Sequence, residues 1–289
     1  MRARVPASSA NLGPGFDVLA LALDLYVEVD VEPAPRLTVR ATGEGSDLAA
    51  TVAIDVTGHD RLAITVRSDI PVARGLGSSA ALAVAAAAAA GSSDPLAVAA
   101  RIDGHPENAA ASMVGGLVAA TTVKGAVRAV RMPLDGGLVF VALVPDRSLS
   151  TSRARHALPQ QVARTDATFN LGRMSLLLAG LADRALLIRE ATEDRLHQDY
   201  RSPMFPEAPQ LLARLVTAGA LASCWSGAGP TLLGICDGAE AESVRTKAEA
   251  AMAEIGVSGR AMLLRPDLEG LVVDGGTSGP YDLGGHSRR

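Results

Sequence analysis

Alternating hydrophobic and polar residues mark the first half of the chain as rich in β-strands. Residues 25–31, Leu-Tyr-Val-Glu-Val-Asp-Val, alternate strictly, as a strand with one buried face does. Residues 62–66 also alternate, and the polar Thr65 and Arg67 suit an antiparallel sheet with one face in water. The pattern predicts strands at residues 2–7, 25–31, 37–41, 52–56 and 62–66, a short apolar helix at 18–23, and no convincing helix within 43–60.

Helical patterns begin with the alanine-rich run at residues 80–90, because alanine has the highest helix propensity and Gly91 offers a C-terminal cap. Asp94-Pro95 predicts the start of a second helix, since proline is favoured at the first helical position. Further along we expect a small-residue helix at 109–113, a hairpin of strands at 117–123 and 127–132, an apolar strand at 138–144, helices at 152–164, 169–182, 208–219 and 239–255, and strands at 221–225, 231–236 and 260–264.

These elements predict the α+β fold class, because helices packed on one face of an antiparallel sheet form such a layer. A chain of 289 residues is long enough for two closely packed domains. We place the boundary at residues 133–137, which gives an N-terminal domain at 1–135 and a C-terminal domain at 136–274. The tail at 275–289 is rich in glycine, serine and charge and is expected to be disordered.

The stretch at residues 71–81 joins the strand at 62–66 to the alanine-rich helix. Gly75 and Gly77 leave the backbone bare, and Ser78 and Ser79 add hydroxyl donors at the start of the helix. A helix N-terminus with open N–H groups and the positive dipole end is a phosphate site. A P-loop is excluded because no Lys-Ser/Thr pair follows the glycines, and a dinucleotide fold would need a fully buried strand and a later acid. We interpret the loop as a triphosphate cradle, and a simple tight turn or a dinucleotide site are the alternatives.

Composition narrows the class of partner. The net charge of −4 provides neither a basic footprint for nucleic acid nor a polybasic patch for a membrane, so a small molecule is the expected partner. Cys224 and Cys236 are too few for a disulfide framework or a zinc site, which indicates core residues and a cytoplasmic protein. The first residues lack the apolar run of a signal peptide, and no segment predicts a membrane span. The oligomeric state is left open, a homodimer included.

Asn11 and Asp17 lie on a polar, glycine-rich loop at residues 7–17. Asp17 is the natural N-cap for a helix at 18–23, which is the simpler interpretation. The alternative is that its carboxylate accepts a ligand ammonium. Together on one tight loop, the two residues are candidates for the rim of a ligand site.

A second polar cluster, Asp-Gly-His-Pro-Glu-Asn at residues 103–108, separates two apolar helices. Asp103 could hold a hard cation together with a serine hydroxyl of the loop at 71–81, since Mg²⁺ takes few carboxylates plus phosphates and waters. A solvated helix end is the plain alternative. His105 and Asn108 lack the spacing of zinc ligands.

Arg155 and Arg201 lie at predicted helix edges among other arginines. By default each is a solvated or salt-bridged surface residue. The alternative is that its guanidinium binds a ligand carboxylate through two parallel hydrogen bonds. The segment Ser-Gly-Ala-Gly-Pro-Thr at residues 226–231 lies between two apolar strands. It is either a tight turn or, at Gly227, a place where the backbone approaches a ligand closely.

These motifs together resemble those of the GHMP small-molecule kinases, and within them the homoserine kinases, over about residues 3–273. Pro-x3-Gly-Leu-Gly-Ser-Ser-Ala looks like the phosphate motif of this superfamily, and Ser226 to Pro230 looks like its third motif. Three narrower signatures favour homoserine kinases over mevalonate or galactose kinases: Ser-Ser-Ala-Asn-Leu-Gly-Pro-Gly-Phe-Asp at 8–17, Gly-His-Pro-Glu-Asn at 104–108, and Thr-x-x-Ala-Arg-x-x-Leu-Pro at 151–159.

The resemblance implies an ATP-dependent kinase that phosphorylates the hydroxyl of L-homoserine with ATP and Mg²⁺ as cofactors. It also implies an N-terminal domain like ribosomal protein S5 domain 2 and a ferredoxin-like C-terminal domain, with the active site between them. Carried over residue by residue, it assigns ATP to Pro71, Val72, Ala73, Arg74, Gly75, Leu76, Gly77, Ser78, Ser79, Ala80 and Ala81, Mg²⁺ to Ser79 and Asp103, homoserine to Asn11, Asp17, His105, Asn108, Arg155, Arg201 and Gly227, and catalysis to Asn108 and Arg155.

The charges agree with an amino-acid substrate. A zwitterion needs a carboxylate for its ammonium and a cationic clamp for its carboxylate, which Asp17, Arg155 and Arg201 can supply. A kinase for another small alcohol and a non-catalytic binding protein on the same fold are the alternatives.

Two departures from the family pattern stand out. Asp103 replaces a common Glu, so it would reach Mg²⁺ through a water, and the segment at 43–62 is short and lacks the helix and the Asn that help to hold adenine.

Overall fold

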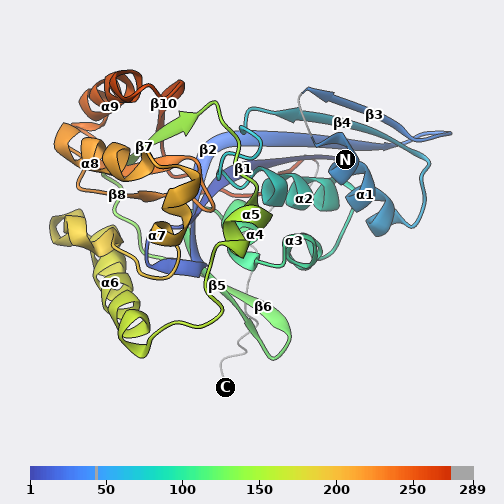
Figure 1. Cartoon of the computed structure of the whole chain (residues 1–289). Coiled ribbons are helices and arrows are strands. Elements are labelled where there is room, and N and C mark those ends of the chain that lie inside the picture. Colours follow the sequence, from blue (N-terminus) through green and yellow to red (C-terminus); the bar gives the residue numbers. More distant parts are fainter. Residues whose placement is uncertain (43–44, 275–289) are drawn as a thin grey trace.

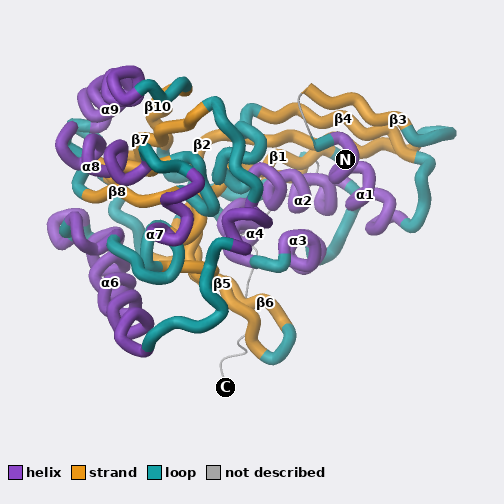
Figure 2. Tube along the Cα trace, in the orientation of Figure 1, coloured by secondary structure: helices purple, strands orange, loops and turns teal. Residues whose placement is uncertain are grey.

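The structure, a computed structural model, describes residues 1–42 and 45–274, with the backbone but not the side chain of Asp103. Its helices pack on two β-sheets (Figure 1, Figure 2). The first sheet has the strand order β11-β1-β2-β4-β3, and a hairpin of β5 and β6 pairs with β2. Its strands are β1 (Arg2–Asn11), β2 (Gly15–Pro33), β3 (Thr38–Thr42), β4 (Leu62–Ser68), β5 (Leu117–Val123), β6 (Ala126–Met132) and β11 (Val272–Val273).

The long strand β2 forms the centre of the first sheet and overturns one prediction. The helix predicted at residues 18–23 is wrong, because these residues continue β2, with β1 on one edge and β5 on the other. Leu19 to Leu23 are completely buried, so this part of the strand shows no alternation of polar and apolar residues. Leucine and alanine favour a helix locally, but pairing with strands on both edges makes this segment a strand. The strands predicted at 2–7, 25–31, 37–41 and 62–66 are confirmed within β1 to β4.

Helix α1 (Ser46–Thr57) corrects two further predictions, the strand at 52–56 and the absence of a helix within 43–60. Ala49, Val52 and Ala53 are its buried residues, at the i, i+3, i+4 spacing of a helix face. The helix connects β3 to β4, and these two strands are parallel. The sheet is therefore antiparallel except at this edge, where a parallel pair requires a crossover.

Helices α2 (Ser78–Ala89), α3 (Pro95–Asp103) and α4 (Pro106–Val114) lie beside α1 on one face of the first sheet (Figure 1). α2 is the innermost, and it contacts β1, β2 and the three neighbouring helices. Ten of its residues, Ala80 to Ala89, are buried. Because alanine side chains are small, the neighbouring helices and strands can pack close to the backbone of α2. Gly91, at φ +89°, follows its C-terminus, and α3 begins at Pro95, both as predicted. The Asp94 side chain caps α3 by accepting a hydrogen bond from the Ala97 N–H.

The second sheet has the strand order β10-β7-β9-β8, with every pair antiparallel. Its strands are β7 (Leu138–Pro145), β8 (Ala222–Trp225), β9 (Leu232–Asp237) and β10 (Gly259–Leu264). Helices α8 (Ala208–Ala218) and α9 (Ala241–Ile255) pack on this sheet. β7 is buried along its whole length because it separates two cores. Val139, Val141 and Leu143 belong to the core under α8 and α9, whereas Phe140 and Ala142 belong to the core of the first sheet.

The segment between β7 and β8 carries the remaining helices. Here α5 (Thr151–His156) is shorter than the helix predicted at 152–164, and α6 (Arg164–Ala182) begins earlier than the helix predicted at 169–182. Pro159 lies just beyond α5 and has no N–H to continue it. Short helical turns at Arg184–Leu186 and Arg189–Thr192, α7 (Gln198–Arg201) and a turn at Ser202–Met204 lead to α8.

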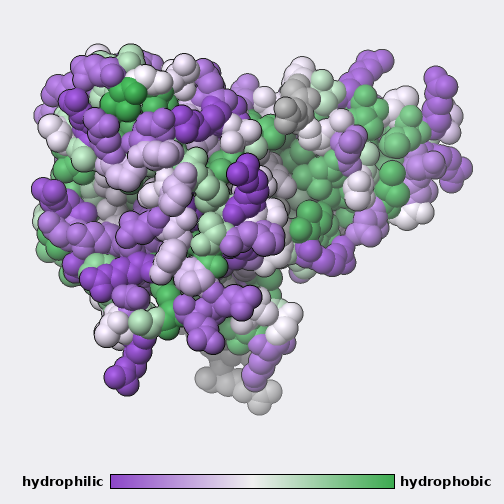
Figure 3. Space-filling view, in the orientation of Figure 1, coloured by the Kyte–Doolittle hydropathy of each residue, from purple (hydrophilic) through white to green (hydrophobic). Residues whose placement is uncertain are grey.

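After β10 the chain returns to the first sheet, where Val272 and Val273 pair with β1. The predicted disordered tail at 275–289 lies outside the described residues. Both cysteines are buried, as predicted, and burial raises the pKa of each thiol to about 12. Among the described residues, no helix combines the length and apolar character that a membrane crossing requires. Hydrophilic side chains cover much of the face in Figure 3, on the side of the second sheet.

Candidate active site

The loop between β4 and α2 has the geometry of an anion cradle. Gly75 and Gly77 have φ angles of +79° and +65°, which L-residues with side chains rarely adopt. A Cβ at Gly75 would lie 2.3 Å from the carbonyl oxygen of Ser226, and one at Gly77 would lie 2.2 Å from the hydroxyl of Ser8. Gly77 precedes α2, and no described side chain caps this helix. The N-terminus of α2 is therefore open to a ligand anion.

A cavity of about 730 Å³ lies over this loop. It is bounded by the loop between β1 and β2, the starts of α2, α4 and α5, the end of α7 and the turn between β8 and β9. The residues around it are Ala10, Asn11, Asp17, Val72, Ala73, Gly75, Gly77, Ser78, Ser79, Ala80, Ile102, His105, Glu107, Asn108, Thr151, Ser152, Arg155, His156, Arg201, Gly227 and Ala228.

The predicted ATP-binding stretch divides into residues that face this cavity and residues that hold the loop. Seven of the eleven residues of 71–81 border the cavity, and Pro71, Arg74, Leu76 and Ala81 do not. Arg74 donates hydrogen bonds to the carbonyl oxygens of Val72, Pro145 and Asp146, which fastens the loop to the end of β7. Leu76 and Ala81 are buried in the core.

Asn11 and Asp17 shape the loop between β1 and β2, and both have left-handed backbone conformations with φ of 73° and 56°. The Asn11 side chain accepts a hydrogen bond from the Asp17 N–H at 3.1 Å and donates one to the carbonyl oxygen of Gly227 at 3.0 Å. The interpretation of Asp17 as a helix N-cap is wrong, because a strand follows it. Its carboxylate borders the cavity instead.

Asp17 is paired with Arg155 of α5. Two parallel hydrogen bonds of 2.8 and 3.0 Å join the guanidinium to the carboxylate, and the His105 ring nitrogen Nδ1 lies 4.0 Å from the same carboxylate. The Asp17 and Arg155 side chains are 31% and 36% exposed, so solvent reaches this pair. A bidentate pair of this kind can open when a ligand supplies both a cation and an anion.

Arg201 differs from Arg155 because it is only 2% exposed. Its NH1 group donates to the Gly227 carbonyl oxygen and to the Nδ1 of His197, both at 2.8 Å. Its Nε is buried with no hydrogen-bond partner among the described residues. Burial lowers the pKa of Arg201 to about 10, and the charge of Arg155 acts in the same direction, so the guanidinium is still protonated at neutral pH. A buried charged donor without a partner favours an anionic ligand.

The polar cluster at 103–108 spans the end of α3 and the start of α4. His105 is the residue before α4, and Glu107 and Asn108 lie in its first turn. The Asn108 side-chain oxygen accepts a hydrogen bond from the Ser8 hydroxyl at 3.0 Å, which places it beside Gly77 of the loop. The side chain of Asp103 lies outside the described residues, so its pairing with Ser79 stays a prediction.

The turn at 226–231 joins the two halves of the molecule. The Ser226 hydroxyl lies 2.8 Å from that of Ser9 and donates to the Gly75 carbonyl oxygen at 2.7 Å, and the Gly227 N–H donates to Ala10 at 3.0 Å. The Thr231 N–H donates to the Arg74 carbonyl oxygen at 3.1 Å. The turn thus packs directly on the loop at residues 71–81, named the phosphate loop below for its predicted role, and places Gly227 at the edge of the cavity.

Comparison with known proteins assigns the family. The family model for the N-terminal domain of GHMP kinases matches residues 45–116, and that for their C-terminal domain matches residues 175–254. The homoserine kinase of Streptomyces avermitilis is 42% identical over 84% of this chain and 88% of its own. That of Desulfitobacterium hafniense is 35% identical over 94% and 99%. The chain belongs to the homoserine kinase family.

The fold agrees with this family. The crystal structure of a homoserine kinase from Cytophaga hutchinsonii superposes with a TM-score of 0.82 at 24% identity, over 94% of this chain and 96% of that one. The resemblance to GHMP kinases and the two-domain α+β fold are therefore confirmed, and the chain is an ATP-dependent kinase. All seven predicted homoserine residues border one cavity in this member of the family, although their roles remain predictions.

Among the described residues, two buried ionisable side chains at or beside the cavity were absent from the predicted set. Glu107 is only 3% exposed and borders the cavity, and its carboxylate lies with Asp17 and His105 in a group whose candidate ligand atoms are within 4.8 Å of one another. Its place in the polar cluster at 103–108 was the available signal. His197 is completely buried and touches Arg201, and no pattern in the sequence distinguishes it from a core histidine.

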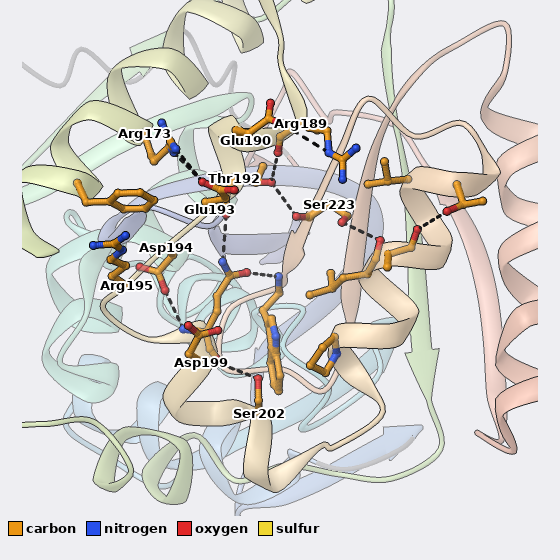
Figure 4. A pocket seen from close by; sticks show the side chains of 18 residues that line it. Arg173, Arg189, Glu190, Thr192, Glu193, Asp194, Arg195, Asp199, Ser202 and Ser223 are labelled. Atoms are coloured by element: carbon orange, nitrogen blue, oxygen red, sulfur yellow. Dashed lines mark hydrogen bonds and ion pairs between the residues drawn. The ribbon is translucent and has the colours of Figure 1, made fainter.

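A second, larger hollow of about 940 Å³ is lined by residues between 169 and 225, in the C-terminal half (Figure 4). Its polar groups are largely engaged with one another: Arg173 with Glu193, Arg195 with Asp166, and the Thr192 hydroxyl with the Ser223 carbonyl oxygen at 2.8 Å. The guanidinium groups of Arg173 and Arg195 both lie over the ring of Phe169. In the cavity over the loop at 71–81, by contrast, the buried Nε of Arg201 has no hydrogen-bond partner among the described residues.

Proposed function

We propose that this member of the homoserine kinase family transfers the γ-phosphoryl group of ATP to the side-chain hydroxyl of L-homoserine, giving O-phospho-L-homoserine. The observation that carries the proposal is the buried Nε of Arg201, which has no hydrogen-bond partner among the described residues, at a cavity that also holds the Asp17–Arg155 pair. The product would serve threonine biosynthesis, and the enzyme would act in the cytoplasm.

The charges of the cavity fit an amino-acid zwitterion. The ammonium would replace the Arg155 guanidinium beside Asp17, and the carboxylate would take the place of Asp17 beside Arg155 and Arg201. Because each broken ion-pair contact is replaced by one of the same sign, insertion of a zwitterion leaves no charge unpaired. A neutral sugar alcohol would leave the Arg201 edge without an acceptor, and mevalonate would bring no cation for Asp17.

The open N-terminus of α2 and the loop containing Gly75 and Gly77 would bind the phosphates of ATP. The oxygen donors at the cavity suit Mg²⁺, which takes hydroxyl and carboxylate oxygens along with phosphates and waters. Ser79 borders the cavity at the start of α2, and the buried Glu107 carboxylate is a further oxygen donor there. We propose Ser79 and Asp103 as the residues that hold the ion, which would neutralise charge on the phosphates when bound.

Positioning and charge stabilisation would supply most of the rate enhancement. Asn108 would orient the attacking hydroxyl, since its side chain is itself held by Ser8 beside the phosphate loop. Arg155 would clamp the substrate and place its hydroxyl in line with the γ-phosphate. The dipole of α2 would stabilise the charge that develops on the transferred group. This scheme requires no dedicated general base.

We also propose that the domain limits are 1–135 and 136–274. The C-terminal strand β11 pairs with β1 across this division, so the last residues of the C-terminal segment would complete the N-terminal sheet. The cavity then lies between the domains, with Asp17, Asn108 and the phosphate loop on one side and Arg155, Arg201 and Gly227 on the other.

A coupled assay of ADP release with homoserine, mevalonate and galactose tests the proposal. We expect turnover with homoserine at millimolar concentration and at least a hundredfold lower kcat/KM for the other two alcohols. ³¹P NMR of the product should show one phosphate monoester formed per ADP released. Equal turnover of mevalonate would contradict the substrate assignment, and a lack of turnover with homoserine would overturn the proposed function.

A further inference from the structure

The His197 side chain, just before α7, is completely buried between the two halves of the molecule. Its Nε2 lies 2.7 Å from the carbonyl oxygen of Gly13, and its Nδ1 lies 2.8 Å from NH1 of Arg201. A carbonyl oxygen only accepts hydrogen bonds and a guanidinium only donates them. The two contacts therefore require a neutral ring with its proton on Nε2 and a lone pair on Nδ1.

The backbone around His197 is fixed by one carboxylate. Asp194, which borders the hollow in Figure 4, accepts hydrogen bonds from the N–H groups of Leu196, His197 and Gln198 at 2.7 to 2.9 Å. The side-chain amide of Asn170, from α6, donates to the same carboxylate at 2.7 Å. The imidazole thus projects from a rigid turn.

A ring contact fixes the plane of the imidazole as well. Phe16, the residue before Asp17, stacks on His197 with ring centroids 5.2 Å apart and an interplanar angle of 24°. The guanidinium groups of Arg155 and Arg201 each lie 5.6 Å from the centre of the Phe16 ring. His197 therefore has the packing and hydrogen bonds of a side chain with one defined orientation.

The bonds to Arg201 leave one particular edge of the guanidinium for a ligand. NH1 carries two hydrogens, and its two hydrogen bonds go to His197 and to the Gly227 carbonyl oxygen. The other long edge, formed by Nε and NH2, is the pair of parallel donors that matches a carboxylate. Its Nε has no hydrogen-bond partner among the described residues.

We propose that His197 is a positioning residue that holds Arg201 so that its Nε and NH2 edge binds the substrate α-carboxylate. This inference rests on the proposed function, because it assigns the anion to an amino-acid substrate. A carboxylate at position 197 would also hold the guanidinium, but it would neutralise the charge that the substrate needs. A neutral imidazole accepts the hydrogen bond and leaves the full charge of Arg201 for the ligand.

The electrostatics of the site support a neutral ring. Burial lowers the pKa of His197 to about 4, opposed by the nearby carboxylates of Asp194 and Asp17 and assisted by the positive charge of Arg201. The ring is then neutral over the whole range in which kinase activity is normally measured.

Two substitutions separate the bonds made by the ring. In His197→Asn the carboxamide oxygen would stand near the position of Nδ1 and can still accept from Arg201. In His197→Gln the amide nitrogen takes the place of Nε2 and keeps the contact with Gly13, while the acceptor for Arg201 is displaced. We expect His197→Gln to raise the homoserine KM at least tenfold with kcat changed less than threefold and the ATP KM unchanged. His197→Asn should recover most of that loss.

A double-mutant cycle with Arg201→Lys distinguishes positioning from general damage. If His197 acts through Arg201, His197→Gln should have little further effect on the homoserine KM in the Arg201→Lys protein. Additive losses, or equal KM values for the Asn and Gln variants, would overturn the proposal. Turnover of homoserine by the unaltered protein is measured first, so failure of the proposed function is recognised separately.

An NMR measurement on the unaltered protein gives a second test that needs no substitution. The chain has five histidines, so a spectrum of the ¹⁵N-histidine-labelled protein is tractable. We expect one imidazole that does not titrate between pH 5 and 8 and carries its proton on Nε2. A buried imidazole with its proton on Nδ1, or one doubly protonated at pH 7, would contradict the inference even if both variants fail to fold.

Discussion

At the scale of single residues, burial separates two arginines that look alike in the sequence. Arg155 is about one third exposed and already paired with Asp17, whereas Arg201 is buried and lacks an ion pair among the described residues. Water screens the first charge and keeps its net interaction modest. The second charge is costly to bury and gains most from a ligand carboxylate. We therefore expect Arg201 to contribute more binding free energy than Arg155.

Substitution of Arg155 tests the substrate clamp. Arg155→Ala should raise the homoserine KM by tenfold or more, about 1.4 kcal/mol, because the carboxylate loses one of its two cationic partners. Arg153→Ala is the matched control, since Arg153 lies on the same short helix, is exposed, and does not border the cavity. Steady-state kinetics with homoserine as the varied substrate provide the measurement. An unchanged KM in Arg155→Ala would show that Arg155 serves only to pair with Asp17.

The proposed role of Ser79 in holding Mg²⁺ predicts a specific change in metal dependence. Removal of metal with EDTA should abolish turnover, and added Mg²⁺ should restore it. Ser79→Ala should raise the Mg²⁺ concentration for half-maximal activity about tenfold, because one oxygen donor is lost. Ser78→Ala, on the same loop, should alter the ATP KM and leave the metal dependence in place. The same metal dependence in both variants would argue against Ser79 as a ligand.

At the scale of secondary-structure elements, the accuracy of the sequence-based predictions depended on how exposed each element is. The strand at 25–31 has one polar face and alternates clearly, so it was predicted correctly. Residues 18–23 of the same strand pair on both edges and lie largely in the core, which removes the alternation and makes a leucine- and alanine-rich run look helical. Only the pairing with β1 and β5 distinguishes a buried strand from a helix at these residues.

The strand predicted at 52–56, where the structure has helix α1, was wrong for the opposite reason. The β-branched Val52, Ile54 and Val56 alternate with other residues and favour a strand locally. The helical spacing of Ala49, Val52 and Ala53 became evident only with the position of α2, on which α1 packs. The segment at 43–62 therefore does contain a helix, although the sequence predicted none there.

The site was more predictable than the strand pairing because its residues lie in motifs with unusual composition. Glycines and polar residues at 71–81, 103–108 and 226–231 are costly in apolar surroundings and therefore conspicuous. The structure brings residues from all three segments to one cavity. The structure also shows the residues that support this site, such as His197, which contacts Arg201, and Asn170, which donates to Asp194. Patterns in a single sequence do not distinguish these two residues from ordinary core residues.

The conformation of the phosphate loop predicts a strong effect of a single methyl group. Gly77→Ala would place a Cβ 2.2 Å from the Ser8 hydroxyl and 3.1 Å from the Asn108 side chain, at a φ of +65°. We expect kcat/KM for ATP to fall at least a hundredfold, about 2.7 kcal/mol, because the loop and Asn108 must both shift. Kinetics with ATP as the varied substrate, alongside thermal unfolding, measure the effect.

Gly58→Ala is the control for this variant, since Gly58 has a similar φ of +74° but no described atom lies within 4 Å of its added Cβ. It should cost about 1 kcal/mol of stability from the left-handed backbone and leave ATP kinetics unchanged. If both variants lose the same activity, backbone strain alone would explain the result and the close approach to Ser8 would be irrelevant.

At the scale of the whole molecule, the cavity depends on contacts that cross between the two sheets. The Arg74 guanidinium binds the end of β7, the Leu149 N–H donates to the Ala73 carbonyl oxygen at 3.2 Å, and the Ser226 hydroxyl contacts both β1 and the phosphate loop. These bonds fix the loop at 71–81 relative to the side of the cavity that carries Arg155 and Arg201. Changes at this junction should therefore affect catalysis and global stability together.

His197, buried at the same junction, predicts how the stability of the whole molecule depends on pH. Its pKa in the folded protein is about 4, below the usual value of 6.5. Between pH 6.5 and 4 the unfolded chain binds a proton that the folded protein does not, so the free energy of unfolding falls as the pH decreases. The contribution is fully present above pH 6.5. Lowering the pH from 7 to 4.5 should remove about 2 kcal/mol through this residue.

Urea unfolding at several pH values, followed by the fluorescence of Trp225, measures this loss. Trp225 is the single tryptophan, is buried, and donates a hydrogen bond from its backbone N–H to the side chain of Gln198, next to His197. Carboxylates also destabilise the protein in acid, so the comparison is with His197→Asn, whose side chain does not titrate. The unaltered protein should lose about 2 kcal/mol more than this variant over the same range. Parallel pH profiles would mean that the folded protein protonates His197 as readily as the unfolded chain does, and a protonated ring would lack the lone pair that holds Arg201.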